Sequence, residues 1–385
     1  MELSIENTLL ELEALFGEAK NRSEFEFILT LINFRGMGRK EETSNLYEWF
    51  EAIEFYKKNY AALTGKDKSR IGLLLYSTFF ENSDFYNIIG SLCRISLGFR
   101  GSSYLYFKTE KHERLLGTGQ KIDFILELLN DCNKQNIITF FSNVHYKEIR
   151  NAFFHSAYVL IDDDFIIHDS APIYINGIGN ANFNVESFLY PKVDYIISFF
   201  DSFKKLYLNS FNSYQTNKVV NGYFPNPIVA TIIGSSNGLK GFLIKDSVSL
   251  FDKLYDSGII YDERFQMWTG LNITYNSQNI ETIEIKQQLT RYEGKADINK
   301  TNFEFQNLVD KVSERKKQDE VDRIIGLLIK FGNVRFQKMS DEINPHKKAS
   351  YPKIILPYYK QAVEFKTTID LTEIKKKIKE LEYLK

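Results

Sequence analysis

Six consecutive residues, Arg150-Asn151-Ala152-Phe153-Phe154-His155, contain the side chains needed to cleave a phosphodiester without a metal ion. Arginine binds a phosphate through a planar fork of N–H donors. Histidine accepts or donates a proton near neutral pH. No other arginine in the chain is followed by a histidine four to seven residues later. Arg150, Asn151 and His155 are therefore the candidate catalytic residues.

The motif ends a segment, 137–155, whose apolar residues recur with helical periodicity. At about 100° per residue, Lys147, Asn151 and His155 lie one above the next at i, i+4 spacing. Arg150 lies about 140° around the axis from His155, and its long side chain can reach the same space. The sequence therefore predicts a polar ridge beside the arginine on one continuous helix.

The same predicted helix carries apolar residues on both sides. The stripe that faces the domain core contains Ile138, Phe141, His145, Ile149, Ala152 and Phe153. Phe140, Val144 and Phe154 lie on the side of the polar ridge. Aromatic side chains on both sides indicate burial of both, so we expect the second face to contact a partner or a second copy of the chain. His145, on the core side, is expected to be structural.

A structural role would explain the same residues without catalysis. A histidine in the last turn of a helix is stabilised by the helix dipole. An arginine on a polar face commonly forms a salt bridge, here for example with Glu148. On this interpretation the chain is a helical protein whose Arg–His pair is fortuitous.

The residues that follow the motif predict a β-hairpin. Residues 157–161 and 165–167 are rich in β-branched and aromatic side chains, and the three aspartates at 162–164 form the turn between them. The stretch 147–167 resembles the end of a HEPN domain, in which a helical bundle ends in a helix bearing R-x(4–6)-H. A hairpin follows in several branches of that family. The resemblance extends over roughly residues 46–169, where the earlier helices match by order and length.

The resemblance implies a role for each residue of the motif. Arg150 would contact the scissile phosphate, His155 would transfer protons, and Asn151 would orient the substrate or the histidine. Active members of the family are metal-independent ribonucleases, in which the 2′-hydroxyl attacks the adjacent phosphorus and leaves a cyclic phosphate. Lys147 and Glu148, beside the motif, are candidate substrate-binding residues.

The resemblance also implies partners. HEPN protomers commonly place their motifs across a shared cleft, so a homodimer through the motif helix is expected. Many such proteins are toxins or abortive-infection effectors in antiphage defence, and an inhibitory or sensor protein would restrain them. We expect RNA as the substrate, with no cofactor and no metal. Because some members only bind a nucleotide or a protein partner, a non-catalytic binding module is the alternative function.

Composition sets limits on these functions. The 385-residue chain has a formal net charge of −1, whereas a sequence-independent nucleic-acid coat needs a large basic surplus. Any contact with RNA is therefore expected to be local and brief. Cys93 and Cys132, the only cysteines, indicate no disulfide framework. Residues 1–16 do not match a secretory signal, and no apolar run predicts a membrane span. These features favour a cytoplasmic protein.

The remaining histidines and the glycine-rich stretch do not have the residue spacing of a metal site or a phosphate-binding loop. His112, His168 and His346 are too dispersed to indicate a zinc site. The glycine- and serine-rich stretch 234–241 follows a predicted strand, but no Gly-Lys-Ser/Thr follows it. We expect a hairpin loop there rather than a phosphate-binding loop.

Periodicity and turn residues predict the organisation of the chain. Helices are expected at 5–15, 25–34, 46–63, 69–80, 85–97, 122–129, 185–214, 248–255 and 371–384, with one or two helices over 303–331. Strands are expected at 228–233, 242–244 and 267–275, and a short turn or strand at 104–107. The stretch 215–227 contains glycine and prolines and loses helical periodicity. We therefore expect a mainly α-helical, HEPN-like domain over 1–215, with its core at 46–169. An α+β domain over 216–385 would have a regulatory, sensor or dimerisation role.

Overall fold

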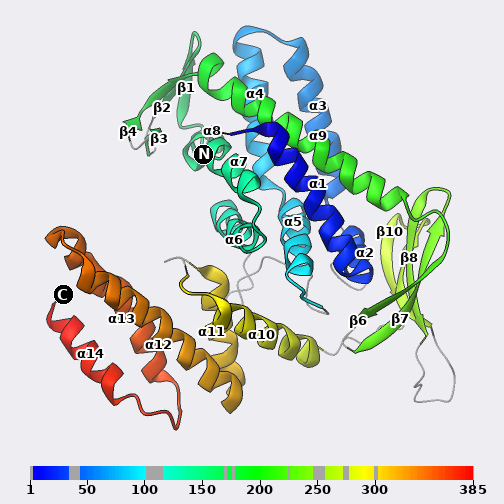
Figure 1. Cartoon of the computed structure of the whole chain (residues 1–385). Coiled ribbons are helices and arrows are strands. Elements are labelled where there is room, and N and C mark those ends of the chain that lie inside the picture. Colours follow the sequence, from blue (N-terminus) through cyan, green and yellow to red (C-terminus); the bar gives the residue numbers. More distant parts are fainter. Residues whose placement is uncertain are drawn as a thin grey trace. The chain divides into compact units, whose positions relative to one another are not determined.

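The computed structural model describes residues 3–33, 44–100, 116–168, 171–175, 178–223, 226–245, 256–271, 277–298 and 302–384. The chain divides into two compact units, one of Met1–Phe107 and Leu116–Tyr275, the other of Lys108–Leu115 and Asn276–Lys385 (Figure 1). The protein is mainly helical and has a five-stranded antiparallel sheet. The turn or strand expected at 104–107 and the helix expected at 248–255 lie outside the described residues.

Apart from the motif helix, the helices expected among the described residues of the first unit are confirmed. They are α1 (Ile5–Arg22), α2 (Glu24–Ile32), α3 (Leu46–Ala62), α4 (Gly65–Glu81), α5 (Ser83–Ser96), α6 (Thr118–Asp131), α7 (Gln135–Val144), α8 (Lys147–Phe154) and α9 (Tyr190–Asn212). Asn82 is the single residue between α4 and α5, and its side chain caps α5 by accepting a hydrogen bond from the Phe85 amide at 2.7 Å. Because α5 begins directly after Asn82, α4 ends at Glu81.

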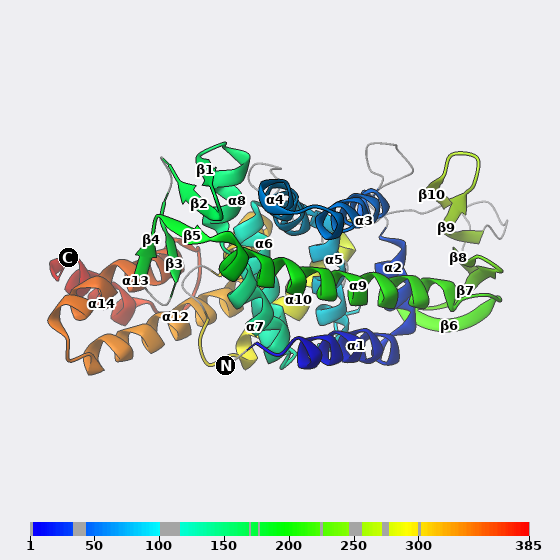
Figure 2. The same ribbon diagram turned by 90° about the horizontal axis from the view of Figure 1, so that it is seen from above.

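Aromatic rings fill the core of the first unit. The ring of Trp49 on α3 lies 5.2 Å from that of Phe200 and 5.5 Å from that of Phe85. Phe85 in turn packs edge-on against Phe203 of α9 at 5.0 Å. Figure 2 shows α9 running beside α1. The long helix α9 therefore contacts most of the other helices of the first unit, including α1, α3, α4, α5 and α7.

Two small sheets follow the motif helix. The first contains β1 (Tyr158–Ile161), β2 (Asp164–Ile167) and β5 (Asn182–Asn184) in the order β1-β2-β5, and the second pairs β3 (Ile173–Ile175) with β4 (Ile178–Asn180). The hairpin β1–β2, with its aspartate turn, confirms the expectation from the sequence. A π-helical turn, η3 (Val185–Leu189), leads into α9, where Pro191 occupies the first turn.

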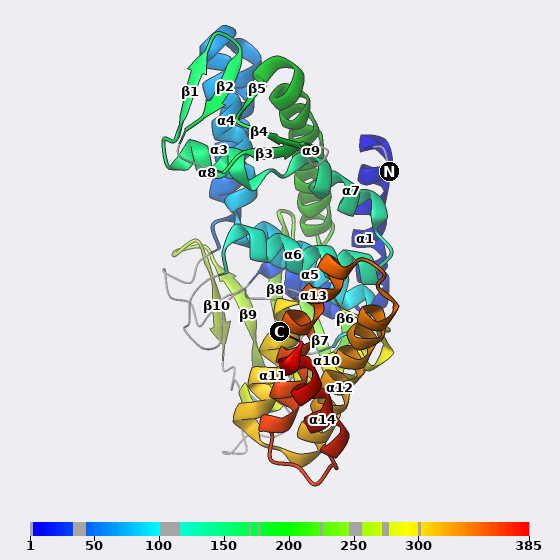
Figure 3. The same ribbon diagram turned by 90° about the vertical axis from the view of Figure 1, so that its left-hand side faces the viewer.

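The large sheet packs on the helices of the first unit. Its order is β10-β9-β8-β7-β6, from β6 (Lys218–Tyr223), β7 (Pro227–Ser235), β8 (Gly238–Lys245), β9 (Asp256–Asp262) and β10 (Met267–Leu271). The β7–β8 hairpin contains the glycine-rich stretch, as expected. Phe25 of α2 packs edge-on against Phe242 of β8 at 5.1 Å. Figures 1 and 3 show the large sheet and β1–β2 at opposite ends of α9.

The division of the chain therefore differs from the one expected at residue 215. The structure divides between β10 and α10, so that the large sheet lies with the helices of the first unit. The loss of helical periodicity at 215–227 marks strand β6, which pairs with β7 from Lys218 to Tyr223. A change from helix to strand produces the same local signal as a linker, and only the packing on α2 distinguishes the two.

The described part of the second unit contains helices and no strand, because the strands of the α+β domain expected over 216–385 lie in the first unit. The helices are α10 (Ser277–Gly294), α11 (Phe303–Arg315), α12 (Gln318–Asp341), α13 (Pro345–Glu364) and α14 (Thr372–Tyr383). Their core includes Leu308, Ile324, Leu328, Phe331, Ile355 and Tyr359. Arg291 and Glu304 form a buried ion pair beside it. Across both units, no described helix is long and apolar enough to cross a bilayer.

The expectation of one helix over 137–155 is wrong, because the chain bends between α7 and α8. His145 and Tyr146 adopt extended conformations, with ψ angles of 112° and 104°. The buried hydroxyl of Tyr76 on α4 donates to the Val144 carbonyl at 2.8 Å and accepts from the Tyr146 amide at 2.7 Å. It thereby satisfies backbone groups that the bend removes from the helical ladder.

Because of the bend, the second face expected on the 137–155 helix is divided between α7 and α8. Phe140 and Val144 are fully buried, and the Phe140 ring stacks on Phe199 of α9 at 4.5 Å. The second face of α7 is thus covered by α9 of the same unit rather than by a partner. On α8, by contrast, the Phe154 side chain remains exposed.

Replacing Tyr76 with phenylalanine should test the role of its hydroxyl. Tyr76→Phe keeps the ring but leaves a buried carbonyl and amide unpaired, so we expect the free energy of unfolding to fall by about 1–3 kcal/mol. Urea denaturation measures this change. Tyr174→Phe, at a tyrosine 62% exposed, is the matched control. Equal stability of both variants and the wild type would contradict the bridging role.

Candidate active site on helix α8

Helix α8 ends in a Schellman motif that fixes the position of His155. The Ala157 amide donates to the Ala152 carbonyl at 2.8 Å, and the Ser156 amide donates to the Phe153 carbonyl at 3.2 Å. Ser156 has a left-handed φ of 53°, where glycine is usual. His155 is the C-cap residue, so its imidazole sits at the end of α8 where β1 begins.

Arg150 is held by three contacts. Its Nε donates to Glu81 at the end of α4 in an ion pair. Its Nη1 donates to the Asn151 side-chain oxygen at 3.0 Å. Its guanidinium carbon lies 5.5 Å from the centre of the Phe154 ring. The salt bridge considered from the sequence is therefore made with Glu81 and not with Glu148, and Arg150 and Asn151 are brought together as predicted.

Glu81 is a site residue that the sequence did not reveal. Its carboxylate also accepts a hydrogen bond from the Thr118 hydroxyl of α6 at 3.1 Å. The ion pair with Arg150 is part-buried, with the two side chains 27% and 37% exposed. Glu81 and Arg150 are 69 residues apart in the chain, so no local pattern links them. The pair orients the arginine and leaves Nη2 without a partner among the described residues.

The remaining predicted residues lie along the same helix with different exposure. Lys147 and His155 are exposed, and Asn151 between them is half-buried. The imidazole of His155 forms no hydrogen bond with a described residue. Glu148 is half-buried in the first turn of α8, where a carboxylate is stabilised by the helix dipole. The spacing of Lys147, Asn151 and His155 is kept, because all three lie after the bend.

His145 lies beside the motif and stays neutral at physiological pH. Burial, reinforced by the positive charges of Arg150 and Lys147, lowers the pKa of His145 to about 4. Its ring packs edge-on against Phe80 of α4 at 4.8 Å. The buried Nε2 atom has no hydrogen-bond partner among the described residues. These contacts agree with the structural role expected for this histidine.

Lys192 adds a cation near the start of α8. Its Nζ atom lies 3.8 Å from the centre of the Phe188 ring and 5.2 Å from that of Tyr146. Burial lowers the pKa of Lys192 to about 8. No signal in the sequence assigns Lys192 to the site, because Lys192 and Tyr146 are far apart in the chain. They meet only through η3 and the bend before α8.

The described residues contain no group of three or more His, Cys, Asp or Glu side chains that could hold a metal ion. The chemistry that these side chains themselves offer is charge stabilisation by Arg150 and proton transfer by His155. Asn151 links the two positions, since it binds Arg150 and precedes His155 by one helical turn.

No family model, curated protein or solved structure matches the chain.

The pH dependence of stability should reveal the buried His145. Its pKa is about 4 in the folded protein and about 6.5 when unfolded. The unfolded state thus binds more protons between these values, so His145 makes the free energy of unfolding fall as the pH drops from about 6.5 to about 4. We expect His145→Gln to flatten that part of the profile, measured by urea denaturation. His346→Gln, at an exposed histidine, is the control; identical slopes for wild type and His145→Gln would contradict the assignment.

Proposed function

We propose that the protein is a metal-independent endoribonuclease of the HEPN type. The observation that carries the proposal is the arrangement on α8, where Arg150 is oriented by Glu81 and Asn151 while His155 is exposed at the helix end. The order of elements supports it: a helical bundle, the motif helix and the hairpin β1–β2 follow one another as in the family that the motif resembles.

The proposed reaction is an internal transesterification of RNA. His155 takes the proton of a 2′-hydroxyl, the 2′-oxygen bonds to the adjacent phosphorus, and the bond from phosphorus to the 5′-oxygen breaks. The products are a 2′,3′-cyclic phosphate and a 5′-hydroxyl, whose proton comes from a protonated histidine or water. Arg150 stabilises the negative charge on the phosphorus oxygens through Nη2. Asn151 is a positioning residue, because it acts through Arg150.

Residues around the motif would bind the rest of the RNA. Lys147 is exposed at the start of α8 and would contact a neighbouring phosphate, and Lys192 lies near the same end. Glu148 would instead accept hydrogen bonds from ribose hydroxyls or base amino groups. With a net charge of −1, the chain would rely on such local contacts rather than on a broad basic surface.

A homodimer through the motif helix would complete the site. The side chains of Phe154 on α8 and of Val159 and Ile161 on β1 are exposed. Since β1 is an edge strand and these residues adjoin the motif, a second copy packed there would bring two His155 residues toward one cleft. One histidine would then act as the base and the other as the acid.

The proposed biological role is that of a toxin or abortive-infection effector in antiphage defence, restrained by an inhibitory or sensor protein. The second unit, whose described part is helical, would carry out that regulation. The alternative is a non-catalytic HEPN module, in which the same face of α8 binds a nucleotide or a protein. The Arg150–Glu81 ion pair is the observation that favours this alternative, because it occupies one edge of the guanidinium that catalysis would use.

Substitutions in the motif should abolish RNA cleavage. We expect His155→Ala and Arg150→Lys to lower the cleavage rate by about 100-fold or more, since the first removes the proton carrier and the second the planar fork. Cleavage of labelled RNA, with EDTA present, measures the rate and the cyclic phosphate product. His346→Ala and Arg70→Ala, at exposed residues, are matched controls.

The same variants distinguish the alternatives in cells. Expression of the wild type should slow growth and degrade RNA, and the two motif variants should do neither. Equal toxicity of folded wild type and variants would exclude the catalytic assignment. Binding of RNA or nucleotide that depends on Arg150, without any cleavage, would instead identify a binding module.

Assembly should depend on the exposed face of β1. We expect the wild type to sediment as a dimer at micromolar concentration, and Val159→Asp with Ile161→Asp to give a monomer that no longer cleaves RNA, since two buried charges oppose packing. Analytical ultracentrifugation measures the mass. Val219→Asp, at an exposed valine on the edge strand β6, is the control. A wild-type monomer that cleaves RNA would rule out the shared cleft.

A further inference from the structure

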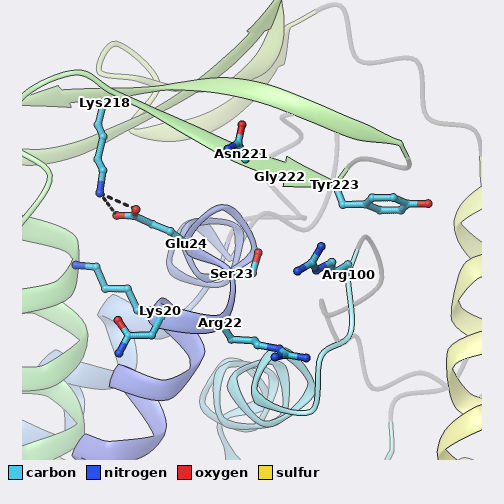
Figure 4. A pocket seen from close by; sticks show the side chains of 10 residues that line it. Lys20, Arg22, Ser23, Glu24, Arg100, Lys218, Asn221, Gly222 and Tyr223 are labelled. Carbon is cyan, nitrogen blue, oxygen red and sulfur yellow. Dashed lines mark hydrogen bonds and ion pairs between the residues drawn. The ribbon is translucent and has the colours of Figure 1, made fainter.

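A pocket of about 500 Å³ lies in the first unit, at the opposite end of α9 from the motif. Figure 4 shows it where the connection between α1 and α2 meets strand β6. Its lining consists of Lys20, Asn21, Arg22, Ser23, Glu24, Arg100, Lys218, Asn221, Gly222 and Tyr223. Four of these side chains are cationic and one is a carboxylate, so the pocket has a net positive charge although the whole chain is slightly acidic.

The carboxylate is engaged at one side of the pocket. Lys218 donates to both oxygens of Glu24, at 2.6 and 2.8 Å, and the Tyr214 hydroxyl donates to the same group at 3.2 Å. Lys20 lies 5.1 Å from the centre of the Tyr214 ring. Arg22 forms no hydrogen bond or ion pair with a described residue. Glu24 therefore balances Lys218, while the positive charge of Arg22 is left for a ligand.

The backbone adds donors to the same space. Ser23 precedes α2 in an extended conformation, and its hydroxyl makes no capping bond, so the first amides of α2 have no partner from that side chain. The absence of a side chain at Gly222 brings β6 close to this turn, since a Cβ atom there would lie 2.5 Å from the Phe25 ring. In Figure 4 the side chains of Ser23 and Arg100 point toward one another across the pocket.

We propose that this pocket binds the phosphates of a free nucleotide, with a nucleoside triphosphate as the ligand class. Arg22 and Arg100 would bind the phosphates, and Tyr223 at the rim would stack on the base. The volume suits a ligand of that size. The pocket is lined by the turn between α1 and α2, by strand β6 and by Arg100 beyond the end of α5. This limited extent favours a small polyanion over a strand of RNA.

The pocket is separate from the proposed active site. Lys20 and Glu24 contact Tyr214, just beyond the end of α9, whereas η3 and the motif lie at its beginning. With 23 residues at a rise of about 1.5 Å each, α9 separates the two by about 34 Å. The inference therefore does not rest on the proposed ribonuclease activity.

Isothermal titration calorimetry with the full-length protein tests the proposal. The probes are ATP, pyrophosphate, inorganic phosphate and a short oligouridylate, each added with EDTA. We expect ATP and pyrophosphate to bind, phosphate to bind more weakly, and affinity to fall as salt rises. Arg22→Gln and Arg100→Gln should each weaken ATP binding about tenfold or more, because each removes a charge-assisted contact.

Matched variants make the outcome decisive. Arg22→Lys should retain part of the affinity, and Arg264→Gln, at an exposed arginine of the β9–β10 turn, should retain all of it. Circular dichroism and urea denaturation confirm folding. Failure of ATP and pyrophosphate to bind at millimolar concentration would overturn the proposal. So would ATP binding unchanged in Arg22→Gln and Arg100→Gln, or binding of oligouridylate alone.

Discussion

The hydroxyl of Tyr76 is the contact on which the arrangement of the motif depends. It bridges the Val144 carbonyl and the Tyr146 amide, and so stabilises the bend that separates α7 from α8. The same helix that carries Tyr76 also carries Glu81, which receives Arg150. The last turns of α4 therefore both redirect the motif helix and orient its arginine.

The electrostatics of the site follow from this packing. Arg150 and Lys147 are positive, and their charges together with burial keep His145 uncharged. Two histidines ten residues apart thus differ in burial. His145 is packed against Phe80, and His155 is exposed at the end of α8. Glu81 offsets one positive charge while fixing the guanidinium plane. A free phosphate oxygen would meet the remaining edge of that guanidinium.

Helix α9 extends from the elements around the motif to the pocket lined by Lys20, Arg22 and Arg100. Its first residues follow η3 beside the small sheet, and its end is anchored by Tyr207, whose hydroxyl donates to the Leu31 carbonyl at 2.6 Å. The large sheet is attached there through Phe25 and Phe242. Aromatic contacts connect α9 to α3, α5 and α7, so a packed core lies between the motif and this pocket.

The sequence by itself determined most described helices of the first unit, but not the break between α7 and α8. It also determined the hairpin after the motif and the spacing of Lys147, Asn151 and His155. These features follow from local periodicity and turn residues, which depend only on residues close together in the chain. The bend at His145, the Arg150–Glu81 pair and the placement of the large sheet were decided by tertiary structure. Each depends on residues distant in the chain: Tyr76, Glu81 and Phe25 meet their partners only after the helices pack. Local pattern therefore indicated the candidate side chains, and long-range packing decided how those side chains are positioned.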